Sequence, residues 1–112
     1  MRRILTILLV ALLALTSACS STKTSGPVTI DLSIANGKIT PPATTYNVSL
    51  GATVTITITS DAADTVHVHG YEIEKEIVAG AKTVITFVAD KNGRYEVETH
   101  TIVATIATLN VR

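Results

Sequence analysis

The sequence has little of what most binding and catalytic sites are built from. It holds one cysteine, one methionine (Met1) and no tryptophan, and aromatic residues make up only 4% of its 112 positions. A face of stacked aromatic rings, as used for sugars or single-stranded nucleic acid, is therefore not expected. Basic and acidic residues are equally frequent, so the basic patch of a nucleic-acid-binding protein is not expected either.

The chain also offers no recognisable hydrolase nucleophile. No Gly-x-Ser-x-Gly segment is present, and the single cysteine, Cys19, ends the export signal described next. A copper oxidase with an N-terminal histidine ligand is excluded too, because the mature chain would begin at Cys19. We therefore expect a protein that is not an enzyme.

The first eighteen residues predict an export signal. Two arginines follow Met1, residues 4–15 form an apolar run, and small residues lead up to Cys19. The run is shorter than the roughly 20 residues that span a bilayer. Residues 15–19, Leu-Thr-Ser-Ala-Cys, resemble the lipobox of bacterial lipoproteins, in which the cysteine carries a diacylglycerol and an acyl chain such as palmitate. Thr16 departs from the usual Leu or Val, and an ordinary cleaved signal with a chance cysteine is the alternative.

These features divide the chain into a signal peptide (1–18), a lipidated cysteine with a flexible polar tether (19–27) and a folded domain (28–112). More than one acyl chain on Cys19 would give stable anchoring. The expected location is the extracytoplasmic face of the cell membrane. The membrane is thus an expected partner, a nucleic acid is not, and any protein partner is left open.

From residue 28 onward, apolar and polar residues alternate with the period of half-buried strands. In residues 53–59, for example, Val54, Ile56 and Ile58 would face a core and the threonines would face water. Turn signals separate such segments every ~8–12 residues. We expect an all-β sandwich of about seven or eight strands without a helix. The expected strands are 28–34, 46–50, 53–59, 65–71, 82–89, 94–100 and 103–111, with 72–77 as strand or ordered loop.

Three histidines are the strongest candidates for a binding site. His67 and His69 are two residues apart on one expected strand, so their side chains should leave the same face. His100 comes near the end of a later strand. Imidazole is the commonest metal ligand among side chains, and two or three converging imidazoles suit copper(II), zinc or iron.

Two segments resemble the cupredoxin superfamily: 64–71 (Asp-Thr-Val-His-Val-His-Gly-Tyr) and 93–100 (Gly-Arg-Tyr-Glu-Val-Glu-Thr-His). They are most similar to the EfeO-type cupredoxin-like domain of bacterial lipoproteins, and the resemblance extends over about residues 28–112. It implies a Greek-key sandwich in which the strands of His67 and His100 lie side by side and share one rim, where the superfamily binds metal. It also implies a site of His67, His100 and His69, with copper first and iron or zinc as alternatives.

The departures from the family are informative. A blue-copper site needs two histidines, a cysteine thiolate and a weak axial ligand such as methionine. Thr99 stands where that cysteine would be, and Met1 would leave with the signal. We therefore expect no blue-copper electron carrier. Residues 101–103, Thr-Ile-Val, replace the acidic or Ser-Gly loop of related lipoproteins, which makes the rim more apolar and removes a possible carboxylate ligand.

Two of the histidines have alternative interpretations. His69 could be a second ligand, or it could pack beside the core with a backbone partner. His100 has a parity problem, because it falls on the face of its strand that carries Glu96 and Glu98. A β-bulge could re-aim it; otherwise it points to solvent beside those two carboxylates.

Two sets of carboxylates also have two interpretations. Glu72, Glu74 and Glu76 alternate along one segment, as Glu96 and Glu98 do along another. Such rows are ordinarily solvated strand faces. Alternatively, Glu98 or Glu72 could join a histidine to hold a harder ion such as iron(III).

The sequence thus predicts a lipid-anchored domain that binds or delivers a metal ion, copper first, through histidines. The alternative is a degenerate cupredoxin fold without metal that acts as a structural or protein-binding module. The distance between His67 and His100 distinguishes the two, because ligands of one ion need their nitrogens within about 4 Å of each other.

Overall fold

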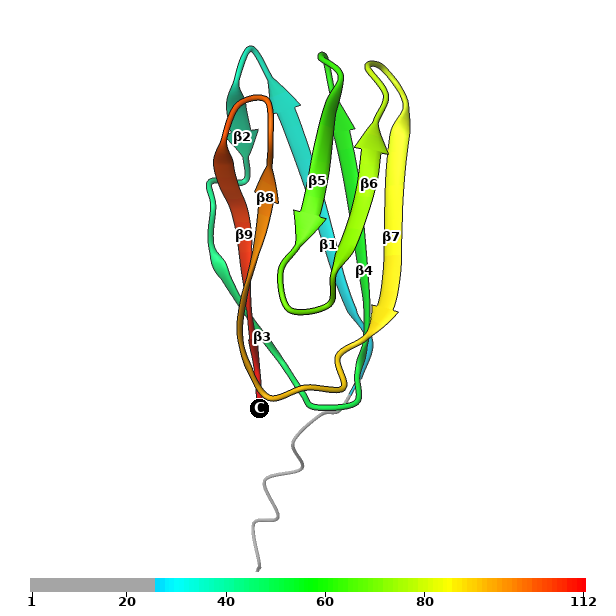
Figure 1. Ribbon diagram of the computed structural model, residues 1–112, viewed down its shortest axis with the longest axis vertical. Coiled ribbons are helices and arrows are strands. Elements are labelled where there is room, and N and C mark those ends of the chain that lie inside the picture. The colour runs from blue at the N-terminus through cyan, green and yellow to red at the C-terminus, as the bar shows by residue number, and fades with distance from the viewer. Residues whose placement is uncertain (1–25) are drawn as a thin grey trace, which may run out of the picture.

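Residues 26–112, which the computed structural model describes, form nine strands in two sheets and no helix (Figure 1). Accordingly, this part of the chain has no helical segment with the length and hydrophobicity needed to cross a membrane. The predicted signal peptide, Cys19 and most of the predicted tether lie outside the described residues.

The two sheets pack face to face, and both are mixed. The first has the strand order β2-β1-β4-β7, in which β1 and β4 are parallel. The second has the order β3-β9-β8-β5-β6, in which β3 and β9 are parallel. The strands are β1 (Val28–Ala35), β2 (Lys38–Thr40), β3 (Thr45–Val48), β4 (Thr53–Ser60), β5 (Asp64–Val68), β6 (Ile73–Ile77), β7 (Lys82–Val88), β8 (Gly93–Thr99) and β9 (Ala104–Val111).

The core lies between the sheets and is built from the alternating residues that the sequence indicates. In β4, Val54, Ile56 and Ile58 are fully buried, while the threonines between them lie on the outer surface. The largest buried side chains come from both sheets: Ile30, Ile56, Ile58, Ile77, Ile106 and Leu109. The predicted all-β sandwich is confirmed, with nine strands rather than seven or eight.

The additional strand is β2, in a segment where the alternation of the sequence is interrupted. Asn36 and Gly37 both have positive φ (51° and 72°), as required at the centre of a two-residue hairpin turn. They return the chain so that β2 pairs with the end of β1. Pro41 and Pro42 end this strand after three residues, which is why the alternation is too short to recognise.

A cluster of partly buried aromatic rings packs against the core beside the turn between β5 and β6. Tyr71 in this turn packs against Phe87 of β7 and Tyr95 of β8, with ring centroids 4.7 and 4.9 Å away. Gly70 has a φ of +79°, and a Cβ at this position would overlap the Tyr95 ring. The glycine in the His-Gly-Tyr segment is therefore required by the packing of this turn.

Candidate metal centre

Strand β5 divides its side chains between the core and the outer surface. Val66 and Val68 are fully buried, whereas His67 between them lies on the outer face of the five-stranded sheet. His69, one residue past the strand, lies on the same side, with its ring centroid 4.2 Å from that of His67. The two imidazoles share one face, as their spacing predicts.

His100 follows the last residue of β8 and begins the turn into β9. Because β8 is the antiparallel neighbour of β5, with Glu98 opposite His67, the strands of His67 and His100 lie side by side as expected. The His100 N–H donates to the carbonyl oxygen of Thr65 (3.1 Å), and its ring centroid lies 5.9 Å from that of His67.

The alternation of faces along β8 places His100 on the same outer face of the sheet as His67 and does not separate the two histidines. The alternation of burial along β8 continues unbroken to Thr99, so His100 lies on the outer face with Glu98. Since His67 lies on this same outer face, no bulge is needed to re-aim His100. The register shift in β8 lies between Val97 and Glu98 and affects pairing with β9.

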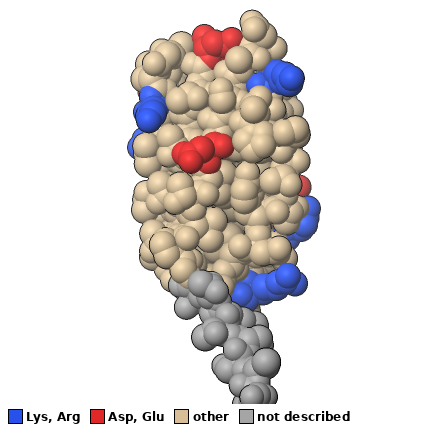
Figure 2. Space-filling model, turned by 180° about the vertical axis from the view of Figure 1, so that it is seen from behind, with Lys and Arg blue, Asp and Glu red and all other residues tan. Residues whose placement is uncertain are grey.

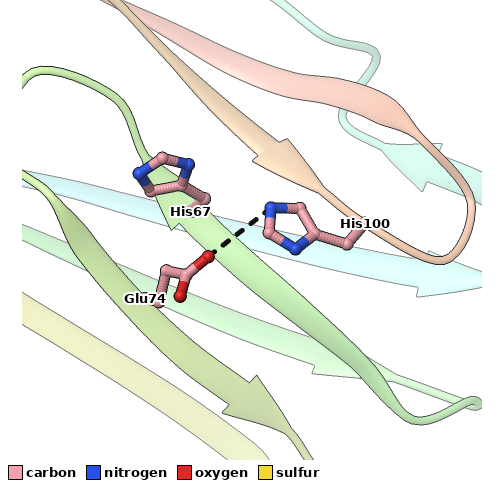
Figure 3. A group of neighbouring side chains, drawn as sticks. All are labelled: His67, Glu74 and His100. Carbon is pink, nitrogen blue, oxygen red and sulfur yellow. Dashed lines mark ion pairs between the residues drawn. The ribbon is translucent and has the colours of Figure 1, made fainter.

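A carboxylate from the next strand completes the group (Figure 3). Glu74 of β6 is the register partner of His67, and its Oε1 lies 3.8 Å from Nε2 of His100. One ligand atom from each of His67, Glu74 and His100 lies within 4.8 Å of the other two. His67 is mostly covered, with 17% of its side chain exposed, whereas Glu74 (60%) and His100 (47%) are open to solvent.

These distances are close to those of a bound site. Metal–nitrogen bonds of 2.0–2.1 Å keep the nitrogens on one ion within about 4 Å of each other. The 4.8 Å limit exceeds this by less than 1 Å, which small rotations of two exposed side chains can supply. We call His67, Glu74 and His100 the His-Glu-His group.

His69 has a different partner. Its Nε2 lies 2.8 Å from Oε2 of Glu98, and because an ionised carboxylate only accepts hydrogen bonds, Nε2 must be the donor. This hydrogen bond holds the pKa of Glu98 below its usual value. The side chain of His69 is 45% exposed. The interpretation that it packs beside the core with a backbone partner is therefore wrong: its partner is a side chain at the surface.

Glu72, the remaining carboxylate near the histidines, lies at the edge of the group. Its Oε2 is 3.7 Å from Nε2 of His67, and 79% of its side chain is exposed. Each of the three imidazoles thus has one glutamate within 3.8 Å.

Asp64, the first residue of β5, binds the turn that contains His100. Its Oδ1 accepts the backbone N–H groups of Thr65 (2.7 Å), His100 (3.1 Å) and Thr101 (2.7 Å), and its Oδ2 accepts that of Ile102 (3.4 Å). Burial raises the pKa of Asp64, but these hydrogen bonds together outweigh it and the pKa is lowered. The carboxylate is therefore ionised at neutral pH.

Thr99 stands where the family resemblance implies the cysteine of a blue-copper site. It is 2% exposed and lies on the inner face of β8, on the opposite side from His100. Its hydroxyl donates to the carbonyl oxygen of Ala104 (3.4 Å).

The donor set is two imidazole nitrogens and one carboxylate oxygen. Such a set suits copper(II), zinc(II) or iron, whereas copper(I) prefers the sulfur of cysteine and methionine. Residues 26–112 contain neither of these two residue types. By ligand type, the group suits a divalent or harder ion better than copper(I).

The family resemblance implies a site at one rim, and His100 begins the turn at the end of β8. The His-Glu-His group lies on the outer face of β5 and β6, beside the end of β8. The opposite outer face, seen from behind in Figure 2, shows only scattered charged side chains, and β4 presents a row of threonines there. Metal-ligand chemistry is thus concentrated on one of the two outer faces.

A two-sheet sandwich with histidines from paired strands defines the class of protein. The chain belongs to the cupredoxin-like domain family, whose model matches residues 5–102. No curated protein is significantly similar in sequence.

Solved structures share the fold at low sequence identity. A heme-copper terminal oxidase is 19% identical with a TM-score of 0.58, and the match covers 76% of this chain and 65% of that one. Fet3p, a multicopper oxidase that functions in iron import, is 18% identical with a TM-score of 0.59, over 75% and 23% of the two chains. A copper-binding protein in its apo form is 11% identical with a TM-score of 0.59, over 75% and 86%. The fold thus occurs both in oxidases and in a copper-binding protein.

Sequence reasoning misses two residues of this region. The sequence presents Glu74 only as part of an alternating acidic row, and the missing information is the β5–β6 register that sets it opposite His67. Asp64 stands in the family-like segment with no role of its own. Its contacts depend on the path of a turn 36 to 38 residues further along the chain.

Proposed function

We propose that this protein is a membrane-anchored extracytoplasmic lipoprotein whose cupredoxin-like domain binds one metal ion, to hold or deliver it. His67, Glu74 and His100 are the proposed ligands. One observation carries the proposal: ligand atoms from β5, from β6 and from the turn after β8 lie within 4.8 Å of one another.

Copper(II) is the first candidate for the ion. Among divalent first-row ions, a site of nitrogen and oxygen ligands binds copper(II) most tightly, with zinc(II) and iron(II) weaker. Zinc and iron remain the alternatives. The EfeO-type resemblance and the carboxylate of Glu74 are the two features that favour iron, because oxygen ligands suit harder ions.

The export signal predicted for residues 1–18 and the lipobox-like segment that ends at Cys19 are the basis for proposing an anchored, extracytoplasmic location. The described domain begins with β1 at the end of the sandwich opposite the turn that holds His100 (Figure 1). A lipid anchor that precedes β1 would therefore place the His100 turn at the end of the sandwich far from the membrane, and the His-Glu-His group on the outer face would be open to a soluble protein that donates or accepts the ion.

The proposed role is binding and not catalysis. Residues 26–112 lack the cysteine and methionine with which blue-copper sites tune electron transfer. Two of the three ligands are half exposed, which suits exchange of an ion with a partner.

The test is calorimetric titration of a soluble form that begins at Ser20, with copper(II), zinc(II) and iron(III) in turn. All nine strands and the buried core lie within 26–112, so this form retains them. We expect one copper(II) ion per chain, and a loss of affinity of about 100-fold in His67→Ala, Glu74→Gln and His100→Ala, since each variant removes a direct ligand.

Glu76→Gln is the matched control. Glu76 lies two residues from Glu74 on the same strand and is also exposed, but it is not part of the group. The copper(II) affinity of the Glu76→Gln variant should stay within about twofold of that of the wild type. Equal losses in Glu76→Gln and Glu74→Gln would indicate a general charge effect and contradict the proposed ligand set.

The module without metal is the second candidate function. It is favoured by the hydrogen bond between His69 and Glu98 (2.8 Å) and by the glutamates 3.7 and 3.8 Å from His67 and His100, which give each histidine a protein neighbour without an ion. Binding no tighter than that of an isolated surface histidine would select this function.

A further inference from the structure

Asp64 connects the two strands that carry the histidine ligands. It begins β5, three residues before His67, and its carboxylate reaches the turn that begins with His100. Neither oxygen is part of the His-Glu-His group. Its contacts therefore indicate a role other than direct ligation.

The carboxylate is unusually well matched to the turn. Three successive backbone N–H groups, those of residues 100, 101 and 102, donate to it at 3.1, 2.7 and 3.4 Å. Hydrogen bonds to an ionised acceptor are roughly twice as strong as neutral ones. Because the donors belong to the backbone, these bonds hold the path of the turn, and at His100 they act together with the bond from the same N–H group to the carbonyl oxygen of Thr65 (3.1 Å).

The turn needs such support, because it contains a strained residue. Val103 has a φ of +47°, and a β-branched side chain at positive φ is a genuine outlier. The residue is 82% exposed, so burial provides no compensation. Strained backbone persists only where neighbouring contacts determine it, and within the described residues the Asp64 bonds bind the three positions immediately before Val103.

We propose that Asp64 is a positioning residue: by binding the backbone of residues 100–102, it holds His100 within reach of His67 and Glu74. This inference rests on the proposed function, because holding His100 near His67 and Glu74 affects affinity only if the three residues bind an ion. The geometric part applies also to the metal-free protein.

The metal-free protein gives the first test. In the Asp64→Ala variant of the soluble form, we expect the amides of Thr101 and Ile102 to exchange with solvent at least about 10-fold faster than in the wild type, by NMR. We also expect the NOE contacts between the His67 and His100 rings to weaken. Unchanged exchange and unchanged contacts would overturn the inference.

The second test is a thermodynamic cycle on copper(II) affinity. Asp64→Ala should lower the affinity about 10-fold, the range found when groups that orient ligands are removed. In the His100→Ala background, the same change should have no further effect. A merely structural role would lower the affinity equally in both backgrounds, and that result would overturn the inference.

Asp61→Ala is the matched control. Asp61 also accepts a backbone N–H through its carboxylate, that of Asn36 at 2.7 Å, but this bond joins the β4–β5 loop to the β1–β2 hairpin and does not reach the His100 turn. The Asp61→Ala variant should match the wild type in its copper(II) affinity and in the NOE contacts between the His67 and His100 rings. If Asp61→Ala weakens binding as much as Asp64→Ala, the effect does not act through His100 and the inference is wrong.

Two further variants cover the case in which Asp64→Ala fails to fold. Asp64→Asn retains an oxygen for the Oδ1 bonds and should lose less affinity than Asp64→Ala. Val103→Asn places at positive φ a residue that tolerates it, and should restore part of the affinity in the Asp64→Asn background. No restoration would contradict the role assigned to the turn.

The outcomes separate this inference from the proposed function. If the wild type binds no ion but Asp64→Ala still parts His100 from His67, the proposed function fails and the positioning stands. If the wild type binds copper(II) and Asp64→Ala binds it equally well, the function stands and the inference fails.

Discussion

Among the described glycines, Gly70 is the one at which an added Cβ would come closest to a neighbouring side chain. We expect Gly70→Ala to lower the free energy of unfolding by about 2–4 kcal/mol, because the added methyl group would overlap the Tyr95 ring and the residue would keep a φ of +79°. Urea-induced unfolding followed by circular dichroism measures this change.

Gly80 provides the control for the backbone part of this effect. Its φ is +76°, yet a Cβ added at this position would meet nothing within 4 Å, so Gly80→Ala should cost only about 1 kcal/mol. Equal costs for the two variants would show that the contact with Tyr95 contributes nothing.

Asp64 predicts how stability depends on pH. Because its pKa is lowered in the folded state, its ionised form contributes stability above the unfolded pKa of about 3.9, and this contribution is lost as the pH falls through the lower folded value. The difference in unfolding free energy between wild type and Asp64→Asn should be constant from about pH 5 to 7 and should narrow below about pH 4. Urea unfolding across this range measures it, and a difference that widens in acid would contradict the prediction.

At the scale of the strand, the buried residues of β5 should determine stability, and the histidine on its outer face should determine ion binding. Val66→Ala should lower the free energy of unfolding by about 2–3 kcal/mol, because it leaves a cavity in the core. His67→Ala, the neighbouring residue on the outer face, should change the stability of the metal-free protein by less than about 1 kcal/mol. Thermal unfolding of both variants checks this. A larger cost for His67→Ala would mean that its packing, and not its ligand chemistry, explains its presence.

The strands themselves could largely be predicted, because each one has a buried and an exposed face. The threonines and the apolar residues of β4 are on the faces that the alternation indicates. The exception is β2, in which only three residues precede Pro41. Such a segment is too short to carry a periodic signal, and only its pairing with β1 identifies it.

The candidate site could be predicted only in part, because strand register is not encoded in local alternation. Spacing places His67 and His69 on one face, and the family resemblance places His100 beside them. The position of Glu74 requires the β5–β6 register. The partner of His69 requires the register of β8 relative to β5, which brings Glu98 within reach.

At the scale of the whole molecule, Cys19 predicts where the protein is found. In a bacterial host, we expect Cys19→Ser to move most of the protein from the membrane fraction to the soluble extracytoplasmic fraction and to abolish incorporation of labelled palmitate, because the acyl chains would be missing. Ser20→Ala is the control and should remain in the membrane fraction. If Cys19→Ser stays there as well, anchoring through this residue is wrong.

The opposite burial of neighbouring residues in β5 has a consequence for how such domains diverge. Val66 and Val68 maintain the fold from one side of the strand, while His67 lies on the other. If the proposed ligands bind an ion, substitutions at position 67 could therefore change or remove that site without altering the buried residues of the core. The fold would then place no constraint of its own on which ligand, if any, this strand presents.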